Sequence, residues 1–227
     1  MSADAYGGDY FDREYFELHP GKARYLRFLA DQIELRAPVG AWLDVGSGLG
    51  FFVAESRSRG RRAFGSEHAL AAALAPRQVA RTALAASDVE RGLPFARGSF
   101  AAVCLWDVIE HLRRPERALV ECRQALQPGG VLSVLTLNAH SVARPLLGRS
   151  WSYHLDPTHV RLYSARSLRR ELVAAGFAEV RIATWMNFLS AGEGDPRLKP
   201  LRRLARVARW PCFGDSLIAF ARAPASS

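Results

Sequence analysis

A short apolar segment that runs directly into a glycine-rich turn is the feature that most constrains this sequence. Residues Ala41–Val45 are apolar apart from Asp44, and Gly46–Gly50 reads Gly-Ser-Gly-Leu-Gly. Glycines between a strand and a helix let a ligand approach the backbone closely, and the N–H groups that open the helix favour a carboxylate or a phosphate. The segment therefore predicts the first strand, turn and helix of a ligand-binding α/β domain.

Strands and helices alternate on either side of this turn. Helical spacing of apolar residues predicts one or two helices within Tyr10–Arg36. Apolar runs predict strands at Ala41–Val45, Arg62–Glu67, Thr82–Ala86, Phe100–Trp106 and Val131–Leu137. Helices are predicted between them at Phe51–Gly60, Ala69–Leu74 and Pro115–Leu126. This alternation indicates a parallel sheet that is covered by helices on both faces.

The pattern changes after Asn138. The segment Asn138–Tyr163 has no clear period and is rich in His, Trp, Tyr and Pro, and a loop of that length is usually functional. A helix is predicted at Ser164–Gly176, capped by its serine and closed by its glycine. Ala178–Thr184 and Ser216–Arg222 read as two further strands, and between them Asp195–Trp210 has the spacing of an amphipathic helix.

Composition limits the class of protein. The 227 residues carry 31 Lys and Arg against 22 Asp and Glu, a net charge of +9, and 49% are hydrophobic. That hydrophobic fraction supports one large folded domain, and no apolar run approaches the roughly 18 residues of a membrane span. Met1–Tyr15 lacks the pattern of a signal peptide. The odd, widely spaced Cys104, Cys122 and Cys212 argue against a disulfide framework, so we expect a cytoplasmic protein.

Two acidic residues define the ligand that suits the glycine turn. Asp44 lies inside the end of the first strand, where a carboxylate disfavours a pyrophosphate and suits an ammonium group. Glu67 ends the second strand 19 residues after Gly48, the distance at which an acid meets ribose hydroxyls. The glycines at 46, 48 and 50 also depart from the G-x-G-x-x-G spacing of dinucleotide sites. A ligand with a ribose, a cation and a carboxylate fits these features, and S-adenosylmethionine has all three.

The chain resembles the class I S-adenosylmethionine-dependent methyltransferases, and within them a ubiquinone-biosynthesis-like bacterial group. The motifs that carry the resemblance, in order, are Leu43–Gly50, Gly65–Glu67, Ser87–Glu90 with Leu93–Phe95 and Ser99-Phe100, Asp107–Leu112, Leu126–Gly130 and Ala175–Phe177. The resemblance implies a Rossmann-like, seven-stranded, mostly parallel sheet with helices on both faces and an antiparallel last strand beside the sixth. It also implies an N-terminal helical cap over residues 1–40 and a methyltransferase domain over 41–227. In that domain 138–163 is an acceptor-side loop and 195–210 a basic amphipathic insertion.

The resemblance assigns cofactor-binding roles by position. The residues that it implies are Asp44, Gly46, Ser47, Gly48, Gly50, Glu67, His68, Ser87, Asp88, Val89, Leu105, Trp106 and Asp107. The glycine turn would wrap the methionine part, Asp44 would hold the ammonium group, and Glu67 would bind both ribose hydroxyls. His68 would flank the adenine and Asp88 would accept from its amino group. One departure is Ala101, where the family often has an acid.

Histidines are the candidates for catalysis. Methyl transfer from a sulfonium mainly needs a positioned nucleophile, and a general base helps when the acceptor is a hydroxyl. His159 lies in a segment, Asp156–Arg161, that is similar to one in bacterial ubiquinone-biosynthesis-like methyltransferases. His154 lies two residues before this segment, and His111 follows the fourth strand. A structural role for His159, bonded to the loop backbone or to a carboxylate, is the alternative.

A metal site is a second interpretation of the same residues. Asp107, Glu110 and His111 resemble the acid pattern of metal-assisted quinone O-methyltransferases and small-RNA 2′-O-methyltransferases, and His159 would complete it. Two carboxylates and two imidazoles suit a divalent ion. Because the same pattern is common where it serves only helix-start geometry, no metal is the favoured expectation.

The expected function is methyl transfer from S-adenosylmethionine to a small molecule, a sugar or a lipid-linked intermediate, with O-methylation preferred. An RNA 2′-O-methyltransferase and a non-catalytic S-adenosylmethionine-binding module are the alternatives. Nucleic acid is disfavoured as a partner because the base-methylation motifs are missing after the fourth strand. The arginine-rich segment Arg197–Arg209 would cover the sheet or contact an anionic membrane peripherally.

Overall fold

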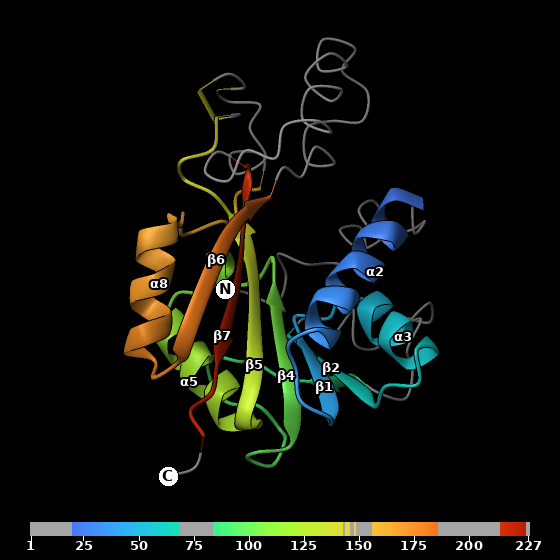
Figure 1. Cartoon of the computed structure of the whole chain (residues 1–227). Helices are drawn as coiled ribbons and strands as arrows, with labels where there is room; N and C mark the ends of the chain where they lie inside the picture. The colour runs from blue at the N-terminus through green and yellow to red at the C-terminus, as the bar shows by residue number, and fades with distance from the viewer. Residues whose placement is uncertain are drawn as a thin grey trace.

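The computed structural model describes residues 20–68, 84–142, 144–145, 148, 156–185 and 214–225. A seven-stranded sheet in the order β3-β2-β1-β4-β5-β7-β6 forms its centre (Figure 1). The strands are β1 (Ala41–Val45), β2 (Ala63–Glu67), β3 (Leu84–Ala86), β4 (Phe100–Trp106), β5 (Leu126–Leu137), β6 (Ala178–Trp185) and β7 (Ser216–Arg222). The helices are α2 (Pro20–Glu34), α3 (Phe51–Ser58), the 3-10 turn η2 (Ile109–His111), α5 (Pro115–Ala125) and α8 (Ala165–Ala174). None of these helices is long and apolar enough to cross a membrane.

The sheet is parallel except at one strand. β7 is inserted between β5 and β6 and pairs antiparallel with both. This arrangement confirms the seven-stranded fold with an antiparallel last strand. The chain first builds outward from β1 through β2 to β3, and then returns to place β4 on the other side of β1. Ligands of such sheets bind outside the carboxyl ends of the strands where the order reverses, here above β1 and β4.

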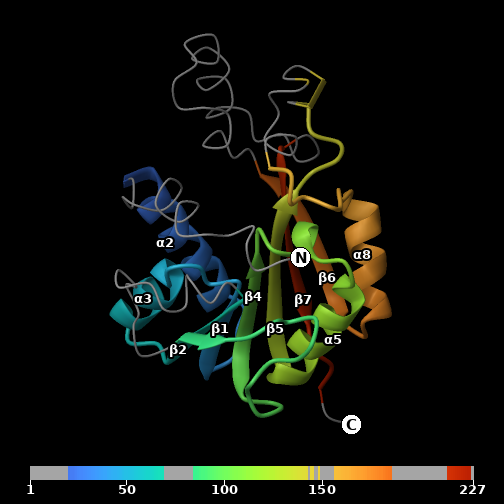
Figure 2. The same ribbon diagram turned by 180° about the vertical axis from the view of Figure 1, so that it is seen from behind.

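Helices cover the two faces of the sheet, and alternate strand residues serve each face. Figures 1 and 2 show α2 and α3 on one face and α5 and α8 on the other. Leu43 and Val45 belong to the buried cluster that includes residues of α5 and α8. Trp42 packs instead with residues of α2 and α3, stacking on Phe52 at 6.2 Å between ring centroids. Because side chains alternate along a strand, Asp44 shares the face of Trp42.

Several predicted bounds are confirmed by the structure, including those of β1, β4 and β7. Ser164 caps α8 by accepting from the Ser167 N–H, and Gly176 ends this helix at φ 85°. β5 differs from the prediction because it begins at Leu126, which pairs with Phe100 before an irregularity in the register. The predicted helices at Ala69–Leu74 and Asp195–Trp210 lie outside the described residues.

Candidate functional site

The turn after β1 is bonded to the end of β2. The N–H groups of Gly46 and Ser47 both donate to the Ser66 carbonyl, at 2.8 and 3.0 Å. Gly46 has a φ of 75°, and a Cβ built on it would lie 2.3 Å from Cγ2 of Val108. Only glycine combines that backbone angle with such a close approach. The turn is thereby held against the segment that follows β4.

The Glu67 carboxylate lies beside this turn. The Gly48 N–H donates to its Oε2 at 2.8 Å. Gly65, two residues earlier on β2, makes the approach possible, because a Cβ there would lie 2.6 Å from Oγ of Ser47. Gly48 and Gly50 also have positive φ, at 52° and 80°. The structure therefore brings the glycine turn and Glu67 together, as the sequence predicted. It also gives a reason for Gly65 in the Gly65–Glu67 motif, to which the sequence assigned no separate role.

Asp44 is buried behind the turn, with 7% of its surface exposed. Burial, and secondarily the nearby Glu67 carboxylate, raises the pKa of Asp44 to about 8. The β1 register places Asp44 between Gly65 of β2 and Cys104 of β4. A buried carboxyl of this kind releases its proton when a cation comes close, since an opposite charge favours the ionised form.

The segment after β3 carries the residues predicted to meet an adenine. Oδ1 of Asp88 accepts from the Glu90 N–H at 2.9 Å, so one carboxylate oxygen stabilises its own loop. The Ser87 Oγ is buried and has no hydrogen-bond partner among the described residues. Because buried polar groups in proteins are usually hydrogen-bonded, this hydroxyl is available to bond a polar group of a ligand. The Val89 side chain is buried, and His68 is exposed at the end of β2.

Three consecutive residues at the end of β4 have different surroundings. Leu105 is fully buried in the core cluster, and its predicted contact with the cofactor stays a prediction. Trp106 donates from Nε1 to Oγ of Ser133 at 2.9 Å and packs on Phe52 at 4.4 Å. Asp107 is exposed with a φ of 53°, a strained angle for a residue other than glycine. Of the three, Asp107 is the one whose side chain is accessible at the crevice.

Two of the predicted histidines meet above β4. The ring centroids of His111 and His159 are 4.7 Å apart. Burial, followed by the neighbouring His159, lowers the pKa of His111. Both rings are partly buried. The fold thus brings a histidine of η2 next to one that follows it by 48 positions in the chain. His154 lies outside the described residues, and its role stays a prediction.

Asp156 and Thr158 join this pair and were not assigned a role from the sequence. The Thr158 hydroxyl lies 2.8 Å from Nδ1 of His111 and donates to Oδ1 of Asp156 at 2.5 Å. Nε2 of His159 lies 3.9 Å from Oδ2 of Asp156. The Asp-x-Thr spacing was the available signal, because an Asp side chain commonly bonds the backbone two residues on.

Glu110 anchors the loop that carries these residues. Its carbonyl oxygen accepts from the N–H groups of Val160 and Arg161, at 2.9 and 3.1 Å. Its side chain is 1% exposed and accepts from the Thr136 hydroxyl at 3.0 Å. Burial, and next the nearby Asp107 carboxylate, raises the pKa of the Glu110 carboxyl well above its usual range.

The structure also bears on the alternative of a metal site. Glu110, His111 and His159 each offer a ligand atom, and these atoms lie within 4.8 Å of one another. This group includes three of the four residues that the sequence suggested and leaves out Asp107. The donors suit a divalent ion by type. The Glu110 side chain is buried and already accepts from the Thr136 hydroxyl, so it has a structural role without an ion.

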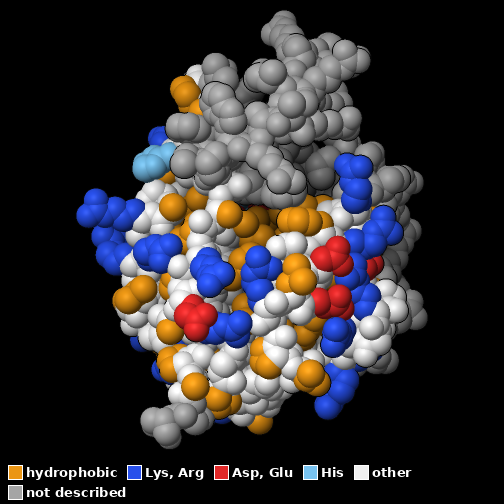
Figure 3. Space-filling model, in the orientation of Figure 1, with side chains coloured by type: hydrophobic (Ala, Val, Ile, Leu, Met, Phe, Trp, Pro, Cys, Tyr) orange, Lys and Arg blue, Asp and Glu red, His pale blue; other side chains and the backbone are white. Residues whose placement is uncertain are grey.

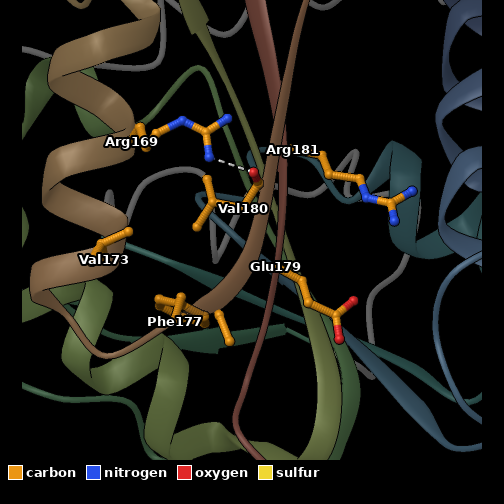
Figure 4. Close-up of a pocket in the computed structure, with 7 residues that line it drawn as sticks. Arg169, Val173, Phe177, Glu179, Val180 and Arg181 are labelled. Atoms are coloured by element: carbon orange, nitrogen blue, oxygen red, sulfur yellow. Dashed lines mark hydrogen bonds between the residues drawn. The ribbon is translucent and has the colours of Figure 1, made fainter.

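A separate hollow of about 490 Å³ lies between α8 and the start of β6 (Figure 4). Figure 4 shows Arg169 and Val173 on α8 and Phe177 in the connection just before β6. Arg169 donates to the Val180 carbonyl at 2.6 Å. β6 runs in the same direction as β5, so its first residues lie at the sheet edge opposite the glycine turn. This hollow is therefore remote from the candidate site.

Basic side chains are spread over the visible face of the molecule and do not form a single patch (Figure 3). Part of the charge is neutralised locally, since Arg59 pairs with Asp31 at 2.6 Å and with Glu55 at 2.7 Å. Arg222 pairs with Glu179 at 3.2 Å. The segment Arg197–Arg209 lies outside the described residues, so contact with a membrane through it stays a prediction.

A family model described as a methyltransferase domain matches residues 16–182, well over half of the chain. The matched region contains the glycine turn, Glu67 and the paired histidines. A search among curated proteins finds no match.

Solved structures share the fold at low sequence identity. An S-adenosylmethionine-dependent methyltransferase from Thermotoga maritima has a TM-score of 0.66 and 18% identity, covering 97% of this chain and 98% of that one. One from Archaeoglobus fulgidus has a TM-score of 0.64 and 17% identity, covering 92% and 100%. The phosphoethanolamine N-methyltransferase 2 of Haemonchus contortus, solved with S-adenosyl-L-methionine, has a TM-score of 0.61 and 16% identity, covering 95% and 59%. These likenesses establish the architecture of the sheet.

Proposed function

The chain belongs to the methyltransferase-domain family and is a methyl-transferring enzyme, and we propose that it methylates a hydroxyl group of a small molecule, a sugar or a lipid-linked intermediate. S-adenosylmethionine is the methyl donor. The contact between the Gly48 N–H and Oε2 of Glu67 supports S-adenosylmethionine as the donor, because it places a carboxylate beside a glycine turn at the carboxyl edge of the sheet. A carboxylate at this position suits the ribose hydroxyls of such a donor.

The residues around the turn fit the donor along its length. Asp44 supplies a buried carboxyl that an ammonium group would ionise, and Glu67 supplies the ribose contact. The buried Ser87 hydroxyl lies next to Asp88, where the adenine end is expected. The donor, when bound, supplies a methyl group on a sulfonium that is already an activated leaving group. The protein then has to position the acceptor and remove its proton.

The histidine pair supports a hydroxyl as the acceptor. His111 lies three residues after Val108, whose side chain lies against the glycine turn. Burial keeps the pKa of His111 below its usual value, so the ring is neutral near pH 7 and able to accept a proton. His159 stands beside it and is the second candidate base.

Calorimetry with S-adenosylmethionine and S-adenosylhomocysteine tests the cofactor assignment. Saturable binding of both is expected, and no binding would leave the enzyme without its proposed donor. Transfer of a tritiated methyl group is then followed into three separate pools: polar metabolites, extracted lipids and total RNA. Label in the first or second pool supports the proposal, whereas label in RNA alone supports the 2′-O-methyltransferase alternative.

His111→Gln and His159→Gln separate the two candidate bases. The true base variant should lose methyl transfer by about a hundredfold, the lower end of what a general base contributes, while binding S-adenosylhomocysteine normally. His140→Gln, at an exposed histidine outside the pair, serves as the matched control. If both pair variants keep full turnover, neither histidine is the base.

A further inference from the structure

We propose that Thr158 is a positioning residue that holds His111 in the tautomer protonated at Nδ1, so that Nε2 is the atom that accepts the proton of the substrate hydroxyl. This inference rests on the proposed function for its use in methyl transfer. Its structural half, the tautomer, stands on the contacts among His111, Thr158 and Asp156 alone.

The Asp156 side chain is an ionised carboxylate that accepts hydrogen bonds from Thr158. Its Oδ1 accepts two hydrogen bonds from the same residue, from the Thr158 N–H at 2.8 Å and from the Thr158 hydroxyl at 2.5 Å. Although partial burial acts to raise it, these two hydrogen bonds and the neighbouring histidines lower the pKa of Asp156. An ionised carboxylate only accepts hydrogen bonds, so the proton between the two side chains belongs to Thr158.

The ionised Asp156 fixes which atom donates in the hydrogen bond between Thr158 and His111. A threonine hydroxyl has one proton, and that proton points to Asp156. The 2.8 Å contact between Oγ1 of Thr158 and Nδ1 of His111 must then have Nδ1 as the donor. A neutral imidazole carries one N–H, so protonation at Nδ1 leaves the lone pair on Nε2.

The charged surroundings of His111 agree with a neutral ring that gains a proton only during turnover. His159 faces it at 4.7 Å between ring centroids, and a second imidazole disfavours a resting positive charge. Asp156 faces it through Thr158 and favours the charge once it forms. Glu110 precedes it on η2, and its raised pKa keeps that carboxyl neutral. Arg161 donates to the carbonyl oxygens of Leu112 and Arg113, so it lies beside the following residues.

The reaction balances with these groups. The acceptor oxygen forms a bond to the methyl carbon, the bond from that carbon to sulfur breaks, and its electron pair stays on sulfur. The hydroxyl proton passes to Nε2 of His111. The resulting imidazolium keeps its Nδ1–H bond to Thr158, and the Asp156 carboxylate offsets its charge through the Thr158 hydroxyl. The proton later leaves to solvent as the products dissociate.

The tautomer is measured without any methyl transfer. Nitrogen-15 NMR of histidine-labelled protein with S-adenosylhomocysteine distinguishes protonated from unprotonated ring nitrogens, and loss of the signals in His111→Gln assigns them. We expect the Nδ1–H form in the wild type and in Thr158→Ser, which keeps the hydroxyl. Thr158→Val is expected to raise the population of the Nε2–H form. An Nε2–H ring in the wild type, or an unchanged Thr158→Val spectrum, overturns the inference.

Kinetics test whether the tautomer is used. Label transfer from tritiated S-adenosylmethionine into the polar-metabolite and lipid pools is followed against pH. Thr158→Val should lower the maximal rate about tenfold, part of what a general base contributes, and move the alkaline-rising limb to lower pH because the imidazolium loses its acceptor. Thr158→Ser should have the wild-type maximal rate and the wild-type pH profile. Both variants should bind S-adenosylhomocysteine as tightly as the wild type.

The two arms separate failure of this inference from failure of the proposed function. The expected tautomer with an unaltered Thr158→Val rate shows that Nε2 is not the proton acceptor. A wild-type protein that transfers no label to either pool contradicts the proposed function, while the spectrum still decides the role of Thr158. In a His111→Gln background Thr158→Val should have no further effect, because the two act as one unit.

Discussion

The Gly48 N–H and Oε2 of Glu67 are joined by a hydrogen bond of 2.8 Å across 19 positions of sequence. This contact joins the turn after β1 to the end of β2, and it orients the carboxylate before any ligand arrives. A site whose charged group is already held in position loses less conformational freedom on binding.

Replacing Glu67 by alanine should weaken S-adenosylhomocysteine binding by at least about tenfold, since hydrogen bonds to a charged group contribute roughly 1.5–3 kcal/mol. The measurement is isothermal calorimetry, with thermal unfolding recorded to verify the fold. Glu116→Ala is the matched control, because this carboxylate is exposed in the first turn of α5. Equal affinities of the two variants would contradict the ribose assignment.

Asp44→Asn should make the protein more stable at alkaline pH. The folded-state pKa of Asp44, about 8, lies above the unfolded value of 3.8, so folding favours the protonated form. That contribution to stability is complete below pH 3.8 and is lost as pH rises through 8. Asparagine is neutral throughout, so its advantage should be larger at pH 8.5 than at pH 5.

The measurement is the melting temperature of both proteins between pH 5 and 9. The difference between variant and wild type should widen by at least about 2 °C, the shift that about 1 kcal/mol gives in a domain of this size. The same variant should bind S-adenosylmethionine more weakly, because the ammonium group loses its carboxylate. A constant difference across the pH range would show that Asp44 does not titrate in this window.

Gly46→Ala should be far more damaging than Gly60→Ala. Both glycines have a φ of 75°, so alanine is strained by a similar backbone penalty, roughly 1–2 kcal/mol, in each. A Cβ at Gly46 would also lie 2.3 Å from Cγ2 of Val108, whereas nothing lies within 4 Å at Gly60. Gly46→Ala should therefore lower both the free energy of unfolding measured in urea and the affinity for S-adenosylhomocysteine, and Gly60→Ala should lower them less.

The clash itself is tested by adding Val108→Ala to Gly46→Ala. Removing the Cγ atoms should recover part of the lost stability. If nothing is recovered, the strained backbone angle alone accounts for the loss. Gly60→Ala should bind the cofactor normally, because Gly60 follows α3 and a Cβ there would meet no atom within 4 Å.

Removal of divalent metals should leave methyl transfer unchanged. Glu110, His111 and His159 lie close enough to share an ion, but Glu110 already has a structural role. Its buried side chain accepts from the Thr136 hydroxyl, and its carbonyl oxygen accepts from the loop backbone. The measurement is turnover after dialysis against a chelator, followed by addition of Mg²⁺ or Mn²⁺. Activity lost on chelation and restored by either ion would contradict this expectation and assign the three residues to a metal.

Local patterns accounted for much of the sheet and for the donor side of the site. The bounds of β1, β4 and β7 follow from buried apolar runs, and the end of α8 follows from Ser164 and Gly176, because these features act between near neighbours. Asp44 and Glu67 were recognisable since the positions of parallel strand ends follow from the order of strands. The start of β5 was missed because Leu126 pairs with Phe100 through an irregular register that no local pattern encodes.

The contacts on the acceptor side follow from the way distant segments fold together. Local sequence places His111 after β4 and His159 in a long loop rich in polar and aromatic residues. It does not show that Thr158 reaches Nδ1 of His111 across 47 positions. That contact depends on the Glu110 carbonyl, which bonds the backbone of Val160 and Arg161 and holds the loop above β4. Periodicity and spacing report which face of an element a residue occupies, whereas hydrogen bonds between distant backbone segments determine which residues meet.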